Sequence, residues 1–98
     1  MNIKETRTED SLVVELEGRL DTLTSPELDA FLEKHYPSIS KLIIDMKNLD
    51  YISSSGLRVV LKAQKAMKEK GGLLIRNANP LVMGVFEVTG FSGLLKFE

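Results

Sequence analysis

Three consecutive serines followed by a glycine are the residues of this chain best suited to chemistry. Ser53, Ser54 and Ser55 lie between a short apolar run and a helical pattern, with Gly56 directly after them. A serine at the start of a helix is small and reachable, and the backbone N–H groups and the helix dipole there favour negative charge. The glycine would give an approaching partner room at the backbone. The structural alternative is that the serines only cap the helix.

The other polar residues do not form a recognisable catalytic or metal site. The single histidine, His35, falls on the apolar face of an expected helix without partners, which is typical of a histidine at the edge of a core. Ile52 stands where a G-x-S-x-G elbow needs glycine. Asp21, Asp45 and Asp50 lie near expected strand ends but lack a known ligand spacing such as that of an EF-hand loop. We therefore expect no catalytic residue, metal or cofactor; the alternative is a small hydrolase that uses one of the serines.

The segments that must position the serines alternate between strand and helix patterns. Residues 12–20 alternate apolar and polar side chains, which indicates a strand with one buried face, and residues 3–7 can pair with it as a hairpin. The continuous apolar run Leu42–Ile44 is typical of a strand covered on both faces, and Leu73–Ile75 is a second such run. Residues 91–98 are expected to form one helical turn and a last extended piece.

Three helices are expected from capping residues and apolar spacing. The first, residues 24–37, has Thr24 as its N-cap candidate and a proline in its first turn, and it ends at a second proline. The second, residues 57–70, stops at two glycines, and the third, residues 79–89, begins at an Asn-Pro pair. This order predicts an α/β fold, a single domain over residues 1–98 with a mixed sheet of four to five strands and helices packed against it.

The third helix is apolar nearly all round, with Glu87 and Thr89 as its polar side chains. Such a helix is either fully buried or partly reserved for a partner. We favour burial, because apolar residues near the end of the chain can cover its outer face. These residues are Phe91, Leu94, Leu95 and Phe97.

Composition restricts the class of protein further. The chain has 98 residues, of which 43% are hydrophobic and 28% charged, as in an ordinary soluble globular domain. Its formal net charge of −1 does not favour direct binding to nucleic acid or to an anionic membrane. Cysteine is absent, residues 1–7 have no apolar run of signal-peptide length, and no stretch could span a membrane. We expect a cytoplasmic protein.

The serine loop resembles the signature of a known family. The run Ile-Ser-Ser-Ser-Gly-Leu-Arg, residues 52–58, is similar to the Asp-Ser-Ser/Thr-Gly-Leu signature of the STAS domain of bacterial anti-sigma factor antagonists. The resemblance extends over nearly the whole chain, because three other segments match family elements in the same order. They are a strand and turn at Val14–Asp21, the central strand at Leu42–Met46 and the closing helix at Phe86–Phe91.

The resemblance implies roles for individual residues of the loop. In this family the serine or threonine directly before the glycine is phosphorylated by a partner kinase that is also the anti-sigma factor, and here that residue is Ser55. The neighbouring Ser53, Ser54, Gly56 and Leu57 are expected to contact the partner. This sequence departs from the commonest pattern by placing Ser53 where many members have aspartate, which bears on the details of phosphoryl transfer.

Two further groups are candidates for partner binding. The resemblance brings Asp21 close to the serine loop, where it can orient the Ser55 hydroxyl or a kinase-bound metal; alternatively, it caps the turn before the first helix. Arg58, Lys62, Lys65 and Glu69 share a narrow, mostly basic sector of the second helix, opposite a broad apolar one. This basic stripe is either a solvated face or a surface that meets an acidic face of the partner. We assign Asp21, Arg58 and Lys62 to partner binding.

These residues lead to one functional hypothesis and one alternative. The unphosphorylated chain is expected to bind an anti-sigma factor with an ATPase-type serine kinase fold and so to release a sigma factor. Phosphorylation of Ser55 ends binding, and a serine phosphatase would restore it. The alternative is a STAS interaction module of another signalling or transport complex, in which Ser55 is not phosphorylated.

Overall fold

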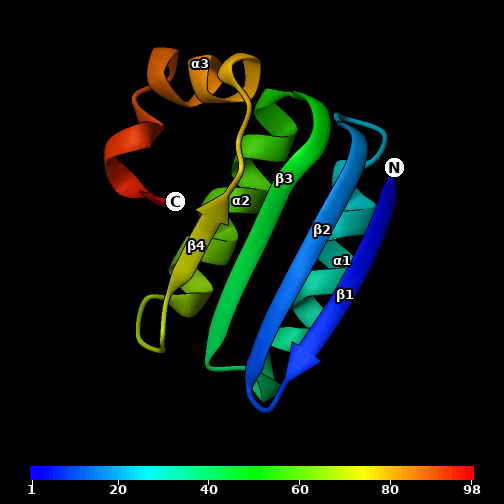
Figure 1. Cartoon of the computed structure of the whole chain (residues 1–98), viewed down its shortest axis with the longest axis vertical. Helices are drawn as coiled ribbons and strands as arrows, with labels where there is room; N and C mark the ends of the chain where they lie inside the picture. Colours follow the sequence, from blue (N-terminus) through cyan, green and yellow to red (C-terminus); the bar gives the residue numbers. More distant parts are fainter.

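A five-stranded sheet in chain order, β1-β2-β3-β4-β5, forms the frame of the molecule. The computed structural model describes all residues from Met1 to Glu98 (Figure 1). The strands are β1 (Asn2–Thr8), β2 (Ser11–Leu20), β3 (Lys41–Ile52), β4 (Leu73–Arg76) and β5 (Lys96–Phe97). The α-helices are α1 (Ser25–His35), α2 (Ser54–Met67) and α3 (Pro80–Val88), and short 3-10 turns lie at Tyr36–Ser38 (η1) and Phe91–Leu94 (η2).

The sheet is mixed, as the sequence predicted. β1 and β2 form an antiparallel hairpin, whereas the β2–β3, β3–β4 and β4–β5 pairs are parallel. Parallel neighbours require a crossover between them, and α1 and α2 are the crossovers from β2 to β3 and from β3 to β4. The carboxyl ends of β2 and β3 therefore meet at one end of the sheet, where the loops that follow them lie side by side.

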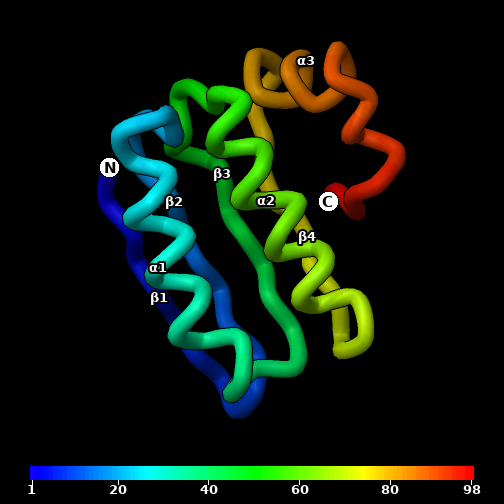
Figure 2. Tube along the Cα trace, turned by 180° about the vertical axis from the view of Figure 1, so that it is seen from behind, coloured from blue at the N-terminus to red at the C-terminus, as the bar shows by residue number.

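The two crossover helices cover one face of the sheet, and they lie in front of the strands when the molecule is seen from behind (Figure 2). The alternating side chains Leu12, Val14 and Leu16 of β2 are buried beneath them, as the period of two predicted. α3 lies instead at the end of the sheet, beyond β3 and β4 (Figure 1). One face thus carries the main core, and the opposite face has no helix on it.

The expectation that β3 is covered on both faces is wrong. Ile43 is 8% exposed but lies outside the main core cluster. Its neighbours in the sheet register are Val13 and Leu74, both half-buried. Side chains within this small apolar row shield one another, so a continuous apolar run occurs here without a second layer of helices.

α2 begins and ends three residues before the bounds that the sequence suggested. β3 continues to Ile52, and Ser53 directly after it is the N-cap, which places Ser54 and Ser55 inside the helix rather than before it. At the other end, Gly72 has φ +91°, and the Gly71 N–H donates to the Ser40 carbonyl oxygen. The two glycines therefore serve the turn into β4 and are not the last turn of the helix.

The outer face of α3 is open, so our preference for its full burial was wrong. Leu81 is 62% exposed and Val88 89% exposed. The helix ends before Gly90, where φ is +79°, and the chain then runs back toward β4, with which β5 pairs (Figure 1). Phe97 accordingly packs edge-on against the buried Phe86, with ring centroids 5.3 Å apart. The remaining apolar stripe of α3 faces outward.

None of the helices is both long enough and apolar enough to cross a membrane.

Candidate functional site

The serine loop and the turn after β2 meet because their strands end in register. Leu20 and Ile52 are partners in the parallel β2–β3 pairing, and the Ser53 N–H donates to the Leu20 carbonyl oxygen over 2.9 Å. Residues 21–24 and 53–56 therefore lie next to each other at the carboxyl end of the sheet. This is where an open α/β sheet places its functional loops.

Ser53 caps α2. Its backbone is extended, with φ −97° and ψ 176°, and its hydroxyl accepts the Gly56 N–H over 3.3 Å. Serine and aspartate are comparable N-caps, so the residue that departs from the family signature keeps the capping function with a neutral group. The capping alternative is thus satisfied by Ser53 alone, which leaves the hydroxyls of Ser54 and Ser55 for other contacts.

Ser55 lies in the first turn of α2, half-buried, with its hydroxyl toward the turn after β2. Its Oγ is 3.4 Å from Oγ1 of Thr22, either of which can donate. No acidic side chain occupies the first turn of α2, so the positive end of this 14-residue helix has no counter-charge of its own. Negative charge added at Ser55 would meet that end of the dipole.

Gly56 permits close packing of α2 against the sheet. A Cβ at this position would lie 2.7 Å from Cγ of Leu20 and 3.0 Å from Cγ1 of Ile52. Gly56 and Leu57 are both buried. The space that we expected an approaching partner to use is therefore filled from inside the fold, and any contact of these two residues with a partner would have to be through the backbone.

Asp21 caps the turn before α1, which is the alternative that the sequence offered to a role beside Ser55. Its carboxylate accepts the N–H groups of Leu23 over 3.0 Å and of Thr24 over 3.1 Å. The pKa of Asp21 is lowered, first of all by the hydrogen bond from the Thr24 backbone. Hydrogen bonds from the Leu23 backbone and the Thr24 hydroxyl and the positive charge of Arg19 lower it further. Thr24 occupies the N-cap position of α1, but its side chain makes no capping bond; its hydroxyl donates to the Arg19 carbonyl oxygen over 2.8 Å.

Thr22 is the residue that sequence reasoning missed. It has no motif around it, and it becomes a neighbour of Ser55 through the β2–β3 register alone. The next residue, Leu23, is 88% exposed and stands at the same turn. Only the β2–β3 register could have indicated this contact from the sequence. Pairing Leu20 with Ile52 places the residues that follow β2 opposite the residues that follow β3.

The expected basic stripe of α2 divides into two parts. Lys62 forms ion pairs with Asp29, over 3.1 Å, and with Glu33, both on α1. Hydrogen bonds to Glu33 and then Asp29 raise the pKa of Lys62. Arg58 and Lys65 are exposed and form neither an ion pair nor a hydrogen bond within the chain. Lys62 thus joins the two helices, and its neighbours keep their charges available.

The remaining candidates for chemistry are held in local contacts. His35 lies 2.8 Å from the Phe31 carbonyl oxygen through Nδ1 and 3.1 Å from Glu5 through Nε2, as a histidine at the edge of the core would. Asp45 accepts from the side-chain amide of Asn77 and from the Lys47 N–H. No group of three or more histidine, aspartate or glutamate side chains is placed to hold a metal ion.

Comparison with known proteins places this geometry in a family. Residues 3–96 match the family described as "Mlab, STAS domain". BtrV of Bordetella bronchiseptica is 35% identical over 82 residues, which covers 82% of this chain and 71% of that protein. An anti-sigma F factor antagonist of Paenibacillus polymyxa is 31% identical over 84 residues, which covers 81% of this chain and 70% of the relative.

Solved structures show the same fold. The anti-sigma factor antagonist SpoIIAA in its unphosphorylated form superposes with a TM-score of 0.85 at 21% identity, covering 99% of this chain and 88% of that one. SpoIIAA of Bacillus in its phosphorylated form gives a TM-score of 0.77 at 20% identity, covering 99% and 91% of the two chains. The mixed sheet with helices on one face is therefore the fold of these proteins.

Proposed function

Because the chain belongs to the STAS domain family, we propose that it is a cytoplasmic anti-sigma factor antagonist controlled by phosphorylation of Ser55. The unphosphorylated form binds an anti-sigma factor that is also an ATP-dependent serine kinase, and this binding frees a sigma factor. Phosphorylation ends the complex, and a serine phosphatase restores the active form. In this cycle the protein is a ligand and a substrate, not a catalyst.

The observation that carries the proposal is the position of the Ser55 hydroxyl. It lies at the start of α2, beside the hydroxyl of Thr22, where the first helical turn has no acidic side chain. A phosphoserine adds about −1.5 to −2 charges. Because the helix dipole favours that charge here, the modification alters the surface without disrupting its own helix.

The phosphoryl transfer uses the Ser55 oxygen as the nucleophile. The bond from Oγ to the γ-phosphorus of ATP forms while the bond from that phosphorus to the ADP oxygen breaks, and the hydroxyl proton passes to a base of the kinase. Either hydroxyl of the Thr22–Ser55 pair can donate; when Thr22 is the donor, the Ser55 hydroxyl keeps its proton free to pass to the base of the kinase. Ser53 supplies no carboxylate, so the base and the metal ion belong to the partner.

Release of the partner follows from charge at the centre of the contact. The phosphate would have to be desolvated or placed against carboxylates of the partner. A coupling free energy of about 1–3 kcal/mol between phosphorylation and partner binding is typical of regulatory effects. It would lower the affinity for the partner by roughly 5- to 150-fold. Ser54 and Arg58 have exposed side chains that can contact the partner. Gly56 and Leu57 are buried and determine the shape of the loop. Asp21 stabilises the adjoining turn, and Lys62 links α2 to α1.

The alternative is a STAS module of another signalling or transport complex in which Ser55 stays unmodified. The replacement of the usual aspartate by Ser53 is the observation that favours it. The two functions differ in one measurable property, which is the mass of the protein isolated with its partner.

The test is a pull-down with the intact protein followed by intact-mass measurement before and after addition of ATP. We expect an anti-sigma factor of the ATPase class in the eluate and one added phosphate on Ser55. Ser55→Ala should abolish the mass shift and keep the partner bound in ATP. Ser54→Ala is the control for the position of the phosphate, because it removes the adjacent exposed hydroxyl but keeps Ser55; one phosphate should still be added, even if loss of a partner contact slows its addition. A phosphate on another residue, or a partner without kinase activity, would contradict the proposal.

A further inference from the structure

Charge is divided unequally between the two halves of the chain. Residues 1–53 carry six basic and eleven acidic side chains, whereas residues 54–98 carry seven basic and three acidic ones. Because the strand order follows the chain order, residues 1–53 form the β1–β2–β3 side of the sheet and residues 54–98 contribute β4 and β5 on the other side (Figure 1). The small net charge therefore conceals a molecule with an acidic side and a basic side.

The basic side contains a groove between α2 and η2. It has a volume of about 700 Å³, and the side chains of α2 form one wall while Gly93 and Leu94 form the other. No aspartate or glutamate lines it. Leu94, at 60% exposure, supplies an apolar patch, and the side-chain oxygen of Gln64 is buried without a hydrogen-bond partner. Cationic, apolar and hydrogen-bonding groups thus share one concave surface.

Three cations of the groove have no partner within the chain. Arg58, Lys65 and Lys68 are exposed and form neither an ion pair nor a hydrogen bond, in contrast to the fourth, Lys62, which is paired with α1. Their spacing along the helix places them in one row that starts one turn after Ser55. Glu69, directly after Lys68, is the acidic residue nearest this row in the sequence, and it does not line the groove.

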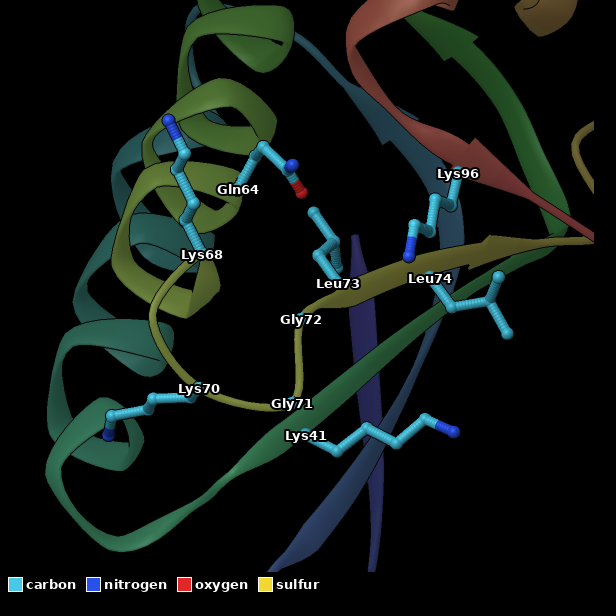
Figure 3. Close-up of a pocket in the computed structure, with 9 residues that line it drawn as sticks. All are labelled: Lys41, Gln64, Lys68, Lys70, Gly71, Gly72, Leu73, Leu74 and Lys96. Carbon is cyan, nitrogen blue, oxygen red and sulfur yellow. The ribbon is translucent and has the colours of Figure 1, made fainter.

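The basic surface continues past the groove toward the start of β4. A second cavity of about 410 Å³ shares Gln64 and Lys68 with the groove and is also lined by Lys41, Lys70 and Lys96 (Figure 3). The ammonium groups of these lysines point in different directions, and that of Lys70 donates to the Tyr36 and Ile39 carbonyl oxygens. Diverging cations do not enclose a small anion, but they suit an extended acidic chain.

We infer that the groove between α2 and η2 binds an acidic polypeptide segment that carries an apolar side chain for the Leu94 patch. The segment would belong to the partner that docks at Ser55, and in this respect the inference rests on the proposed function. Nucleic acid fits less well, because no aromatic side chain lines the groove for base stacking and the other half of the chain is acidic. The groove thus extends the contact from the phosphorylated serine along the length of α2.

The experiment measures binding of a fluorescein-labelled nine-residue peptide of seven glutamates and two leucines by fluorescence anisotropy. The double variant Lys65→Gln/Lys68→Gln should bind it about tenfold more weakly, since each exposed charge contact contributes up to about fivefold. Lys34→Gln/Lys47→Gln is the matched control, because Lys34, like Lys65, lies in the last turn of a helix and both control lysines are outside the groove. The control should change affinity by about twofold at most.

Two further arms test the apolar patch and the class of ligand. Leu94→Ser should weaken binding of the acidic peptide. A control peptide with glutamine in place of every glutamate should not bind. Equal losses in the two lysine double variants, no binding of the acidic peptide, or tighter binding of a single-stranded oligonucleotide of equal charge would each overturn the inference. If the peptide fails while the kinase still modifies Ser55, the groove inference fails alone. If the peptide binds as expected but Ser55 is never modified, the proposed function fails instead.

Discussion

The hydroxyl of Thr22 lies 3.4 Å from the hydroxyl of Ser55, although 33 positions separate the two residues in the chain. The contact exists because β2 and β3 end in register, which brings the turn after one strand against the helix that follows the other. It places a neutral hydrogen-bonding group, not the nearby Asp21 carboxylate, beside the proposed phosphoacceptor.

Replacing Thr22 should therefore affect phosphorylation more than folding. Thr22→Val removes the hydroxyl that holds the Ser55 side chain, and we expect the rate of phosphorylation to fall roughly two- to tenfold, the effect of one neutral hydrogen bond. The melting temperature should change little, because Thr22 is exposed. Thr6→Val, an exposed threonine of β1, is the control. An unchanged rate would show that Thr22 has no part in positioning Ser55.

Negative charge at Ser55 should not destabilise the protein. The first turn of α2 has no acidic residue, so Ser55→Asp is expected to raise the free energy of unfolding by roughly 0.3–1 kcal/mol while it weakens partner binding. Thermal melts and binding measurements on the same samples separate the two effects. A loss of several degrees together with the loss of binding would indicate local unfolding instead of a charge effect at the interface.

Two glycine substitutions test whether Gly56 is required for packing. Gly56→Ala places a methyl group 2.7 Å from Cγ of Leu20 and should destabilise the protein by about 1–3 kcal/mol in urea denaturation. Gly84→Ala, within α3, has no heavy atom within 4 Å of its new methyl group and should stabilise by roughly 0.5–1 kcal/mol. If both variants changed stability equally, close approach to the sheet would not be the reason for Gly56.

Asp21 should make the stability of the protein depend on acid. Its carboxylate has a pKa below the ordinary value of 3.8, so its contribution is present above that pH and disappears as the pH falls through the lowered value. Asp21→Asn should be less stable than the parent at pH 7, and the gap should narrow below pH 3.8. Asp50→Asn, an exposed aspartate without hydrogen bonds, is the control for denaturation at several pH values. If Asp21→Asn slowed phosphorylation without lowering stability, the carboxylate would have a direct part in phosphoryl transfer.

Lys62 and Lys65 should respond differently to the same substitution. Lys62→Gln breaks the ion pairs with Asp29 and Glu33 and should lower the melting temperature. Lys65→Gln breaks no contact within the chain and should instead slow association with the partner, with a weaker dependence on salt. Melting curves and association rates at two salt concentrations compare the two variants. If Lys62→Gln instead slowed association with the partner and left the melting temperature unchanged, Lys62 would belong to the partner-binding surface.

Local patterns in the sequence were sufficient for most of the secondary structure. The alternation in β2 and the apolar spacing of α1 predicted strand and helix, because each pattern states which side chains one element can bury. Asn79 was correctly identified as a helix cap, and its side chain accepts the Val82 N–H over 2.9 Å. The order of these elements, with the resemblance of residues 52–58 to a family signature, also predicted the mixed sheet and the start of α2 as the candidate site.

Contacts between distant residues were decided only by the tertiary structure. The partner of Ser55 depends on the β2–β3 register, and the partners of Lys62 depend on how α1 lies against α2; neither is a property of the nearby sequence. The role of Gly56 follows from the distance between α2 and Leu20, and the open face of α3 follows from the path of the chain after Gly90. Periodicity specifies which face of an element is apolar, but only packing determines what covers that face.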